Sequence, residues 1–239
     1  MQDNTSIQNP RNNTDQPLEV KDCLLDNIER ISYSDALALQ HDLHDRCAAG
    51  EIPGVLLLLE HNPVITMGVK TSSRGNVLVS AESLKAQGVE LVETDRGGDV
   101  TYHGPGQLVG YPIVRLREFG GDLHGYLRSL EQCVIDTIAQ FGLKGERNGL
   151  AGVWVGDKKI CSIGVAVRKW VTYHGFALNV DPNLSHFQLI NPCGLPSEKI
   201  TSMAKLLGSA PSMQEVREAC ARSFAAVFGV NMTPRGEPR

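Results

Sequence analysis

The residue best suited to nucleophilic chemistry is Cys193, which lies in the segment Asn191-Pro-Cys-Gly194. Proline fixes the backbone ahead of the thiol and glycine leaves it unrestricted behind it, which is typical of a loop that exposes a side chain. Core cysteines usually sit in apolar strands or helices, as Cys133 and Cys220 do here. The position is therefore compatible with a reactive thiol, although an inert loop cysteine is the commoner case on this evidence alone.

A second candidate is Lys159, which stands at the start of the apolar run 160–165. Burying an amine is costly unless it finds a partner, so a lysine entering a buried strand suggests a task for that amine. The common alternative is a lysine whose amine reaches solvent from a strand end. Lys158 fits that solvated role better.

The segment from Arg96 to Gln107 is the densest polar and glycine-rich stretch of the chain. Glycines let the backbone approach a ligand closely, so its amides can face an anion or a carbonyl oxygen. A structural turn that contains a histidine is the alternative, and the spacing of a P-loop is absent. His174, farther along, could be a base, a ligand or a hydrogen-bonded core residue. The scatter of His103, His174 and Cys193 argues against zinc.

The surrounding pattern predicts three capped helices and seven strands. The helices follow Ser34, Asp122 and the capping box at 212–215, and each ends near a glycine. The strands cluster without alternating helices, which predicts an α+β fold with helices packed on a mixed sheet. A Gly156-Asp157 turn joins two of them as a hairpin. The expected strands span 55–60, 64–67, 89–94, 107–114, 153–155, 159–167 and 171–180.

Composition sets further limits. With 239 residues, 41% of them hydrophobic, the chain is long enough for one domain with a sizeable core. Its net charge of -4 is unlike that of a general nucleic-acid binder, and its apolar runs fall far short of the roughly 20 residues that span a membrane. The cysteines lack disulfide or zinc spacing, which suits reduced thiols in the cytoplasm. Polar composition predicts disordered tails at 1–17 and 232–239 around a single domain at 18–231.

Taken in order, several segments resemble the lipoyl(octanoyl) transferase family. The similarity begins with Leu59-Glu-His-Asn-Pro-Val-Ile-Thr-Met-Gly68 and holds in spacing from about residue 18 to 230. No single motif would suffice, but the series does. The remaining segments are Arg96 to Gln107, Gly152-Val-Trp-Val, Lys159-Ile, Ser162-Ile-Gly, His174-Gly-Phe-Ala-Leu-Asn-Val180 and Asn-Pro-Cys-Gly194.

The resemblance implies the fold of the biotin and lipoate protein ligase catalytic domain. It also implies that Cys193 carries the acyl group as a thioester and that Lys159 lowers the pKa of that thiol. No metal or other cofactor is implied. The residues implied in holding the acyl chain and its carbonyl are Arg96, Gly97, Gly98, Asp99, Val100, Thr101, Tyr102, His103, Ser162, Ile163, Gly164, Gly175, Phe176 and Ala177.

The implied activity moves an octanoyl or lipoyl group from acyl carrier protein to a lysine of lipoyl domains, the first step of endogenous protein lipoylation. The implied acceptors are lipoyl domains of 2-oxoacid dehydrogenase E2 subunits and the glycine cleavage H protein. An ATP-dependent lipoate or biotin ligase and a non-catalytic acyl-binding protein are the alternatives. A papain-like hydrolase fits less well because both candidate histidines precede the cysteine. A basic rim for acidic partners is expected from Arg74, Arg96, Lys158, Arg168 and Lys169.

Overall fold

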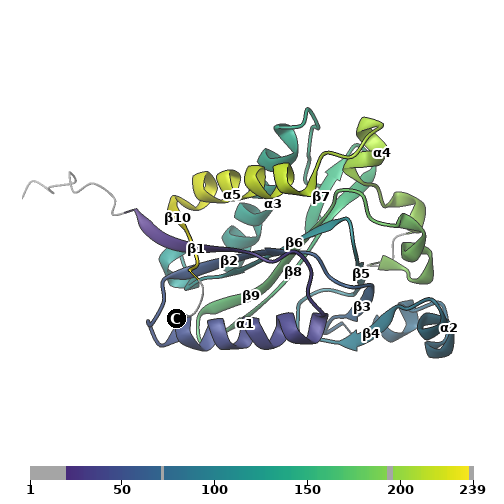
Figure 1. Ribbon diagram of the computed structural model, residues 1–239, viewed down its shortest axis with the longest axis horizontal. Coiled ribbons are helices and arrows are strands. Elements are labelled where there is room, and N and C mark those ends of the chain that lie inside the picture. The colour runs from purple at the N-terminus through teal and green to yellow at the C-terminus, as the bar shows by residue number, and fades with distance from the viewer. Residues whose placement is uncertain (1–19, 71–72, 193–195, 237–239) are drawn as a thin grey trace, which may run out of the picture.

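The computed structural model describes residues 20–70, 73–192 and 196–236, and its centre is a seven-stranded mixed sheet (Figure 1). The strand order is β10-β1-β2-β6-β9-β8-β7; the pairs β10–β1 and β1–β2 are parallel, and the others are antiparallel. The bounds are β1 (Lys21–Asn27), β2 (Gly54–Leu59), β6 (Gln107–Ile113), β7 (Gly152–Val155), β8 (Lys158–Arg168), β9 (Val171–Asn179) and β10 (Val230–Pro234).

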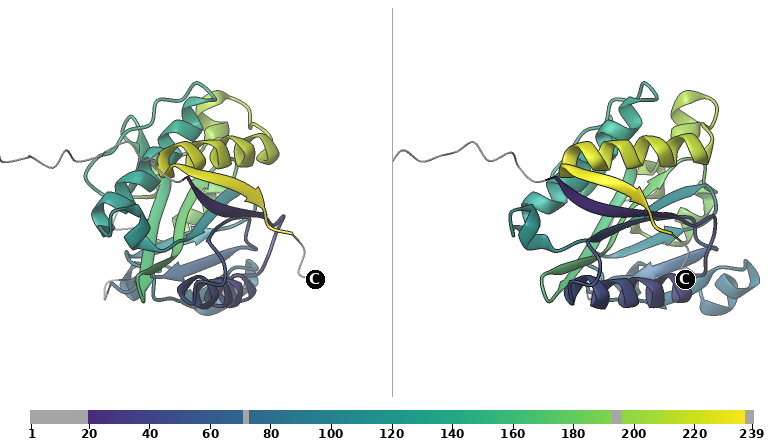
Figure 2. Two further views of the ribbon diagram at one scale, coloured as in Figure 1. Left: turned by 90° about the vertical axis from the view of Figure 1, so that its left-hand side faces the viewer. Right: turned by 60° about the vertical axis from the view of Figure 1, so that its left-hand side comes forward.

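Helices cover both faces of this sheet (Figure 2). α3 (Leu123–Ala139) and α5 (Met213–Phe228) pack on one face, and α1 (Tyr33–Ala48) packs on the other. A strand that is covered on both faces typically has a continuous apolar sequence. β2 fits this pattern, because all six of its residues are buried. The α+β architecture predicted from the clustered strands is confirmed.

The helix starts follow the capping chemistry of the sequence at two of three sites. The carboxylate of Asp122 accepts from the backbone amides of the first turn of α3, and Ser212 and Glu215 form the predicted capping box of α5. For the first helix the predicted cap, Ser34, is wrong. Its cap is Ser32, whose hydroxyl accepts from the amide of Asp35, because the helical backbone already begins at the buried Tyr33.

A smaller sheet extends the molecule at one end (Figure 1). Its strands are β3 (Val64–Met67), β4 (Glu90–Glu93) and β5 (Val100–His103), in the order β4-β3-β5. The short α2 (Ala81–Ala86) precedes β4, and α4 (Met203–Leu207) precedes α5. β5 was not expected, because it lies inside the polar, glycine-rich segment. This strand carries the middle of that segment, residues 100–103.

The predicted tail from residue 232 is wrong for its first residues. Strand β10 runs to Pro234 and pairs in parallel with β1, with Cys23 opposite Met232 and Leu25 opposite Pro234. The sequence does not predict this strand, because it is short and ends on a proline. A proline is tolerated there because the strand lies at the edge of the sheet. The predicted tail 1–17 lies outside the residues that the structure describes, as do residues 237–239.

Within the described parts of the chain, no helix has the length and apolar character needed to cross a bilayer.

Candidate active site

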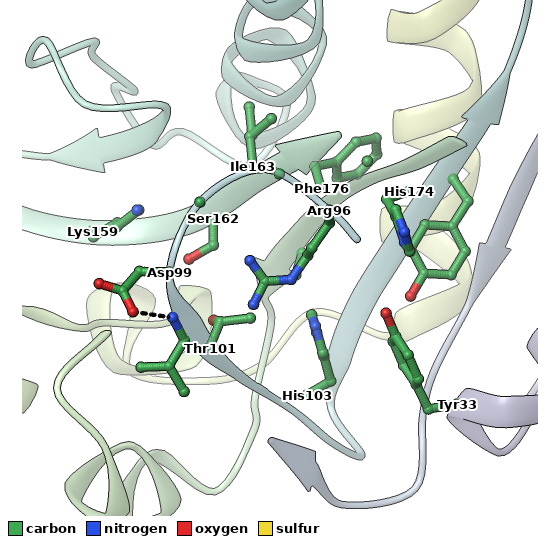
Figure 3. A pocket seen from close by; sticks show the side chains of 16 residues that line it. Tyr33, Arg96, Asp99, Thr101, His103, Lys159, Ser162, Ile163, His174 and Phe176 are labelled. Carbon is green, nitrogen blue, oxygen red and sulfur yellow. Dashed lines mark hydrogen bonds between the residues drawn. The ribbon is translucent and has the colours of Figure 1, made fainter. Parts of the chain in front are cut away.

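One pocket lies between the segment 96–103, β8 and β9 (Figure 3). In Figure 3, Lys159 and Ser162 lie toward one end, Tyr33 and His174 lie toward the other, and the guanidinium of Arg96 lies between them. Its lining residues are Tyr33, Arg96, Gly98, Asp99, Val100, Thr101, His103, Tyr111, Lys159, Ser162, Ile163, Gly164, His174, Gly175, Phe176 and Ala177.

Paired glycines on β8 and β9 allow the segment 96–98 to lie directly on the sheet. Gly164 and Gly175 are register partners, and a Cβ on Gly164 would come within 2.6 Å of the Gly97 carbonyl oxygen. The Gly97 amide in turn donates to the Val165 carbonyl at 2.9 Å. The absence of a side chain at Gly164 therefore lets the segment 96–98 dock onto β8, and this docking fixes one wall of the pocket.

Arg96 ties this segment to the smaller sheet. Its Nη2 donates to the carbonyl and hydroxyl oxygens of Thr66 at 2.7 and 2.9 Å, and Nη1 donates to the Gly97 carbonyl at 3.2 Å. The side chain is only 7% exposed. Arg96 therefore cannot serve in an exposed basic rim, and that part of the expectation is wrong.

Two other members of the expected rim have acidic neighbours. Arg74 forms an ion pair with Glu93, and Arg168 lies 2.9 Å from a carboxylate oxygen of Asp45. Their charges are therefore partly compensated within the chain.

Lys159 enters the pocket from the start of β8. Its side chain is 4% exposed, and its Nζ lies 5.0 Å from the centre of the Trp154 ring. Its carbonyl accepts from the amide of Thr201 at 2.9 Å, so this residue also joins β8 to the chain that follows position 193. Lys158 is half-buried. Of the two adjacent lysines, the structure thus places Lys159 in the pocket.

The opposite end of the pocket is aromatic and uncharged near neutral pH. The rings of Tyr33 and His103, which line the pocket, stack at 6.3 Å, and the ring of His61, which does not line it, lies 5.8 Å from that of Tyr111. Burial lowers the pKa of His61 to about 4 and holds that of His103 well below its usual value. Burial also raises the pKa of Tyr33 and Tyr111. These rings therefore present hydrogen-bonded but neutral surfaces.

His174 combines an unusual backbone with a carboxylate partner. Its φ is 56°, a conformation uncommon for a residue other than glycine, and its amide donates to Gln40 at 2.8 Å. Its Nε2 lies 2.8 Å from Asp95, which also accepts from the Tyr173 hydroxyl. Burial would raise the pKa of Asp95, but these hydrogen bonds outweigh it and hold that pKa below its usual value. Burial lowers the pKa of His174 itself.

Cys193 lies outside the residues that the structure describes, but the chain on either side of it is anchored to the pocket. Before it, the Asn191 amide donates to the Asn76 carbonyl at 2.8 Å, and the Asn76 side chain donates to Asp99 at 2.8 Å. After it, Ile200 forms a bridge with Lys159.

The cysteines in the described parts of the chain are all buried, and they are Cys23, Cys47, Cys133, Cys161 and Cys220. Burial raises the pKa of Cys23 to about 12 and raises that of Cys161 further. A hydrogen bond that the Cys133 thiol donates to Cys220, together with burial, raises the pKa of Cys133 well above its usual value. A thiol is nucleophilic as its thiolate, so these groups are poorly suited to attack a thioester near neutral pH.

The residues that line the pocket differ from the predicted set in two ways: some predicted residues do not line it, and some lining residues were not predicted. Gly97 and Tyr102 do not line the pocket; the Tyr102 hydroxyl faces away and bonds to His186 at 2.7 Å. Tyr33 and Tyr111 line it but were not expected. Tyr33 begins a helix and Tyr111 sits in an apolar strand, so no local signal marked either one.

Within 20–70, 73–192 and 196–236, no group of three or more histidine, cysteine or carboxylate side chains could hold a metal ion.

Comparisons with known proteins establish the family. The model of the lipoyl protein ligase A/B catalytic domain matches residues 32–225. An octanoyltransferase of Solibacter usitatus is 47% identical over 216 residues, which cover 90% of this chain and 97% of that protein. An octanoyltransferase of Nitratidesulfovibrio vulgaris is 47% identical over 209 residues, which cover 87% and 95%. The chain therefore belongs to the lipoyl protein ligase A/B catalytic domain family.

Within that family the sequence falls among the octanoyltransferases, which confirms the resemblance and marks the chain as an acyltransferase. Solved structures agree on the fold. A bipartite lipoate protein ligase from Thermoplasma acidophilum matches with a TM-score of 0.71 at 17% identity, over 90% of this chain and 87% of that one. Lipoate-protein ligase A bound with ATP also gives 0.71, at 18% identity over 90% and 88%.

Proposed function

We propose that this protein transfers an octanoyl group from acyl carrier protein to a lysine of a lipoyl domain, through a thioester on Cys193 that Lys159 promotes. The observation that carries the proposal is the pocket itself. It holds a buried lysine at one end and a neutral aromatic wall at the other, and the chain on both sides of Cys193 is anchored to it.

The proposed chemistry needs two exchanges at one carbonyl carbon. The Cys193 thiolate attacks the donor thioester, the bond to the carrier sulfur breaks, and the released carrier thiolate takes the proton of the Lys159 ammonium, which leaves Lys159 as a neutral amine. The acceptor lysine then attacks the Cys193 thioester as a neutral amine, an amide forms, and the Cys193 thiolate is released. The amine proton passes to a base, for which the pocket offers the Lys159 amine in its neutral form.

A thioester donor also explains why no nucleotide would be required. Thioester exchange changes the free energy little, and amide formation from a thioester runs downhill. Lys159 contributes to the first exchange because a nearby ammonium favours the thiolate of a cysteine. The neutral rings of Tyr33, His103 and Tyr111 suit an apolar chain better than charged groups would.

The relatives support a set of proposed partners. Curated relatives carry the name octanoyltransferase, and one structural neighbour is described together with its E2 lipoyl domain. We therefore propose octanoyl carrier protein as donor, lipoyl domains of 2-oxoacid dehydrogenases and the glycine cleavage H protein as acceptors, and the cytoplasm as the location. The assignment to the octanoyltransferases favours this activity over an ATP-dependent ligase.

The test is intact-mass analysis after incubation with octanoyl carrier protein, followed by peptide mapping. One octanoyl group should appear on Cys193, and Cys193→Ser should fold normally but form no adduct and no product. Cys161→Ala is the matched control, because Cys161 lies in the same strand as Lys159, β8, but is buried in the core. Active enzyme without a Cys193 adduct, or product that disappears when apyrase removes ATP, would contradict the proposal.

A further inference from the structure

The hairpin of β7 and β8 contains an irregularity beside Lys159. Gly152 pairs with Ser162 and Val153 pairs with Cys161, but Trp154 then pairs with Lys159. Ile160 is thus the extra residue of a β-bulge. Consistent with this, Ile160 and Cys161 are consecutive residues that are both 0% exposed and belong to the same core cluster.

The bulge decides which way the lysine points. Ser162 lines the pocket, and side chains alternate between faces in a regular strand. Without the extra residue, Ile160 would face the pocket and Lys159 would face the core beneath α3 and α5. The bulge reverses this order and turns Lys159 to the pocket side.

Two residues of β7 then confine the turned side chain. The Nζ of Lys159 lies 5.0 Å from the centre of the Trp154 ring, and Trp154 is itself 2% exposed. A Cβ on Gly152 would come within 2.7 Å of the lysine Cε and 2.4 Å of the Cys161 carbonyl oxygen. The aliphatic part of the Lys159 side chain therefore packs against Gly152, which has no side chain, and its amine lies over the indole of Trp154.

We propose that Trp154 is a positioning residue whose indole face holds the Lys159 amine in place and favours its ammonium form. The proposal rests on the proposed function, in which that ammonium promotes the Cys193 thiolate. A buried lysine loses hydration, which favours the neutral amine, and a cation over an aromatic face recovers part of that loss. Among side chains, the indole gives the strongest attraction of this kind.

Other ionisable groups face the lysine from the elements around it. Arg96 and Asp99 line the same pocket, the Cys161 thiol lies on the core side of β8 but within electrostatic reach of Lys159, and Glu131 of α3 accepts from the Gly152 amide at 3.3 Å. Substitutions at Trp154 leave all of these groups unchanged. A change in the ionisation of Lys159 in such variants therefore reports on the indole.

The test is an NMR titration of the Lys159 side chain in lysine-labelled protein, with Lys159→Met to assign the signal. In Trp154→Leu the measured pKa of Lys159 should fall by roughly 0.5 to 1.5 units, and in Trp154→Phe by less. Trp170→Leu is the matched control, because Trp170 is the other tryptophan and is 48% exposed in the β8–β9 turn. It should leave the pKa of Lys159 unchanged.

An unchanged pKa in folded Trp154→Leu would overturn the proposal. If that variant does not fold, Trp154→Phe decides, since it retains the bulk of an aromatic ring and must still show a fall. The titration needs no substrate, so its outcome is separate from that of the proposed function. A parent enzyme that forms no Cys193 thioester refutes the dyad, whereas an unchanged titration refutes the role of the indole.

Discussion

Acid should destabilise this protein through His61, whose ring contacts those of His103 and Tyr111 at the aromatic end of the pocket. The residue is fully buried, with Nδ1 placed to donate to the Ile31 carbonyl at 3.0 Å and Nε2 placed to accept from the Tyr111 hydroxyl at 2.7 Å. A neutral imidazole satisfies both bonds with one donor and one acceptor. Protonation would bury a charge, which is why the pKa falls to about 4, and it would also remove the acceptor of the Tyr111 hydroxyl.

The size of the effect follows from the two pKa values. Because the folded pKa is depressed, the contribution of His61 is fully present above 6.5, its value in the unfolded chain, and is lost as pH falls toward about 4. That interval is roughly 2.5 pH units, and each unit corresponds to about 1.4 kcal/mol, so His61 alone should remove roughly 3 kcal/mol. The depressed pKa of His103 adds to the loss in the same direction.

Urea unfolding at several values between pH 7 and pH 4 measures this loss directly. His61→Asn should be less stable than the parent at pH 7, yet it should lose roughly 3 kcal/mol less on acidification. His124→Asn is the control, because the His124 side chain is 94% exposed and its removal should leave the acid dependence intact. If His61→Asn and the parent lost stability in parallel, His61 would not be the buried neutral group described above.

The remaining predictions concern the pocket. Lys159→Met should shift iodoacetamide alkylation of Cys193 to higher pH, by roughly one to three units, because the nearby ammonium is lost. Lys158→Met should not, and an unshifted profile with full activity in Lys159→Met would exclude the dyad. Gly164→Ala should cost about 1–3 kcal/mol in thermal or urea unfolding and reduce transfer, since its Cβ would meet the Gly97 carbonyl at 2.6 Å. In Gly75→Ala the added Cβ would contact nothing within 4 Å, so this variant should change neither stability nor transfer.

Features with a local cause could be predicted from the sequence. Asp122 and the Ser212 capping box mark helix starts because a side chain bonds amides only two or three residues away. The turn at Gly156 is equally local, since it requires positive φ, which is 59° there. Lys159 drew attention because an amine at the mouth of an apolar strand is energetically unusual.

Features with a distant cause could not be predicted. Tyr33 and Tyr111 reach the pocket because α1 and β6 happen to be neighbours of β9, which neither local pattern reveals. The bulge at Ile160 depends on the partner strand, and a single strand gives no sign of it. The docking of Gly97 on Gly164 likewise depends on two segments that are distant in sequence, so neither segment alone predicts it.

The pairing of β10 with β1 has a consequence for how the chain is made. It joins residues 21–25 to residues 230–234, so the first strand of the large sheet receives its outer neighbour only after the other strands of both sheets have been synthesised. Until then, one edge of β1 has unpaired backbone groups, a feature that invites association between chains. Contacts so distant in sequence also slow folding, because a long loop must close before they form. Because α5 contacts β10, the helix and the strand after it are fixed together, and β10 covers the edge of β1 that stays unpaired until this strand is made.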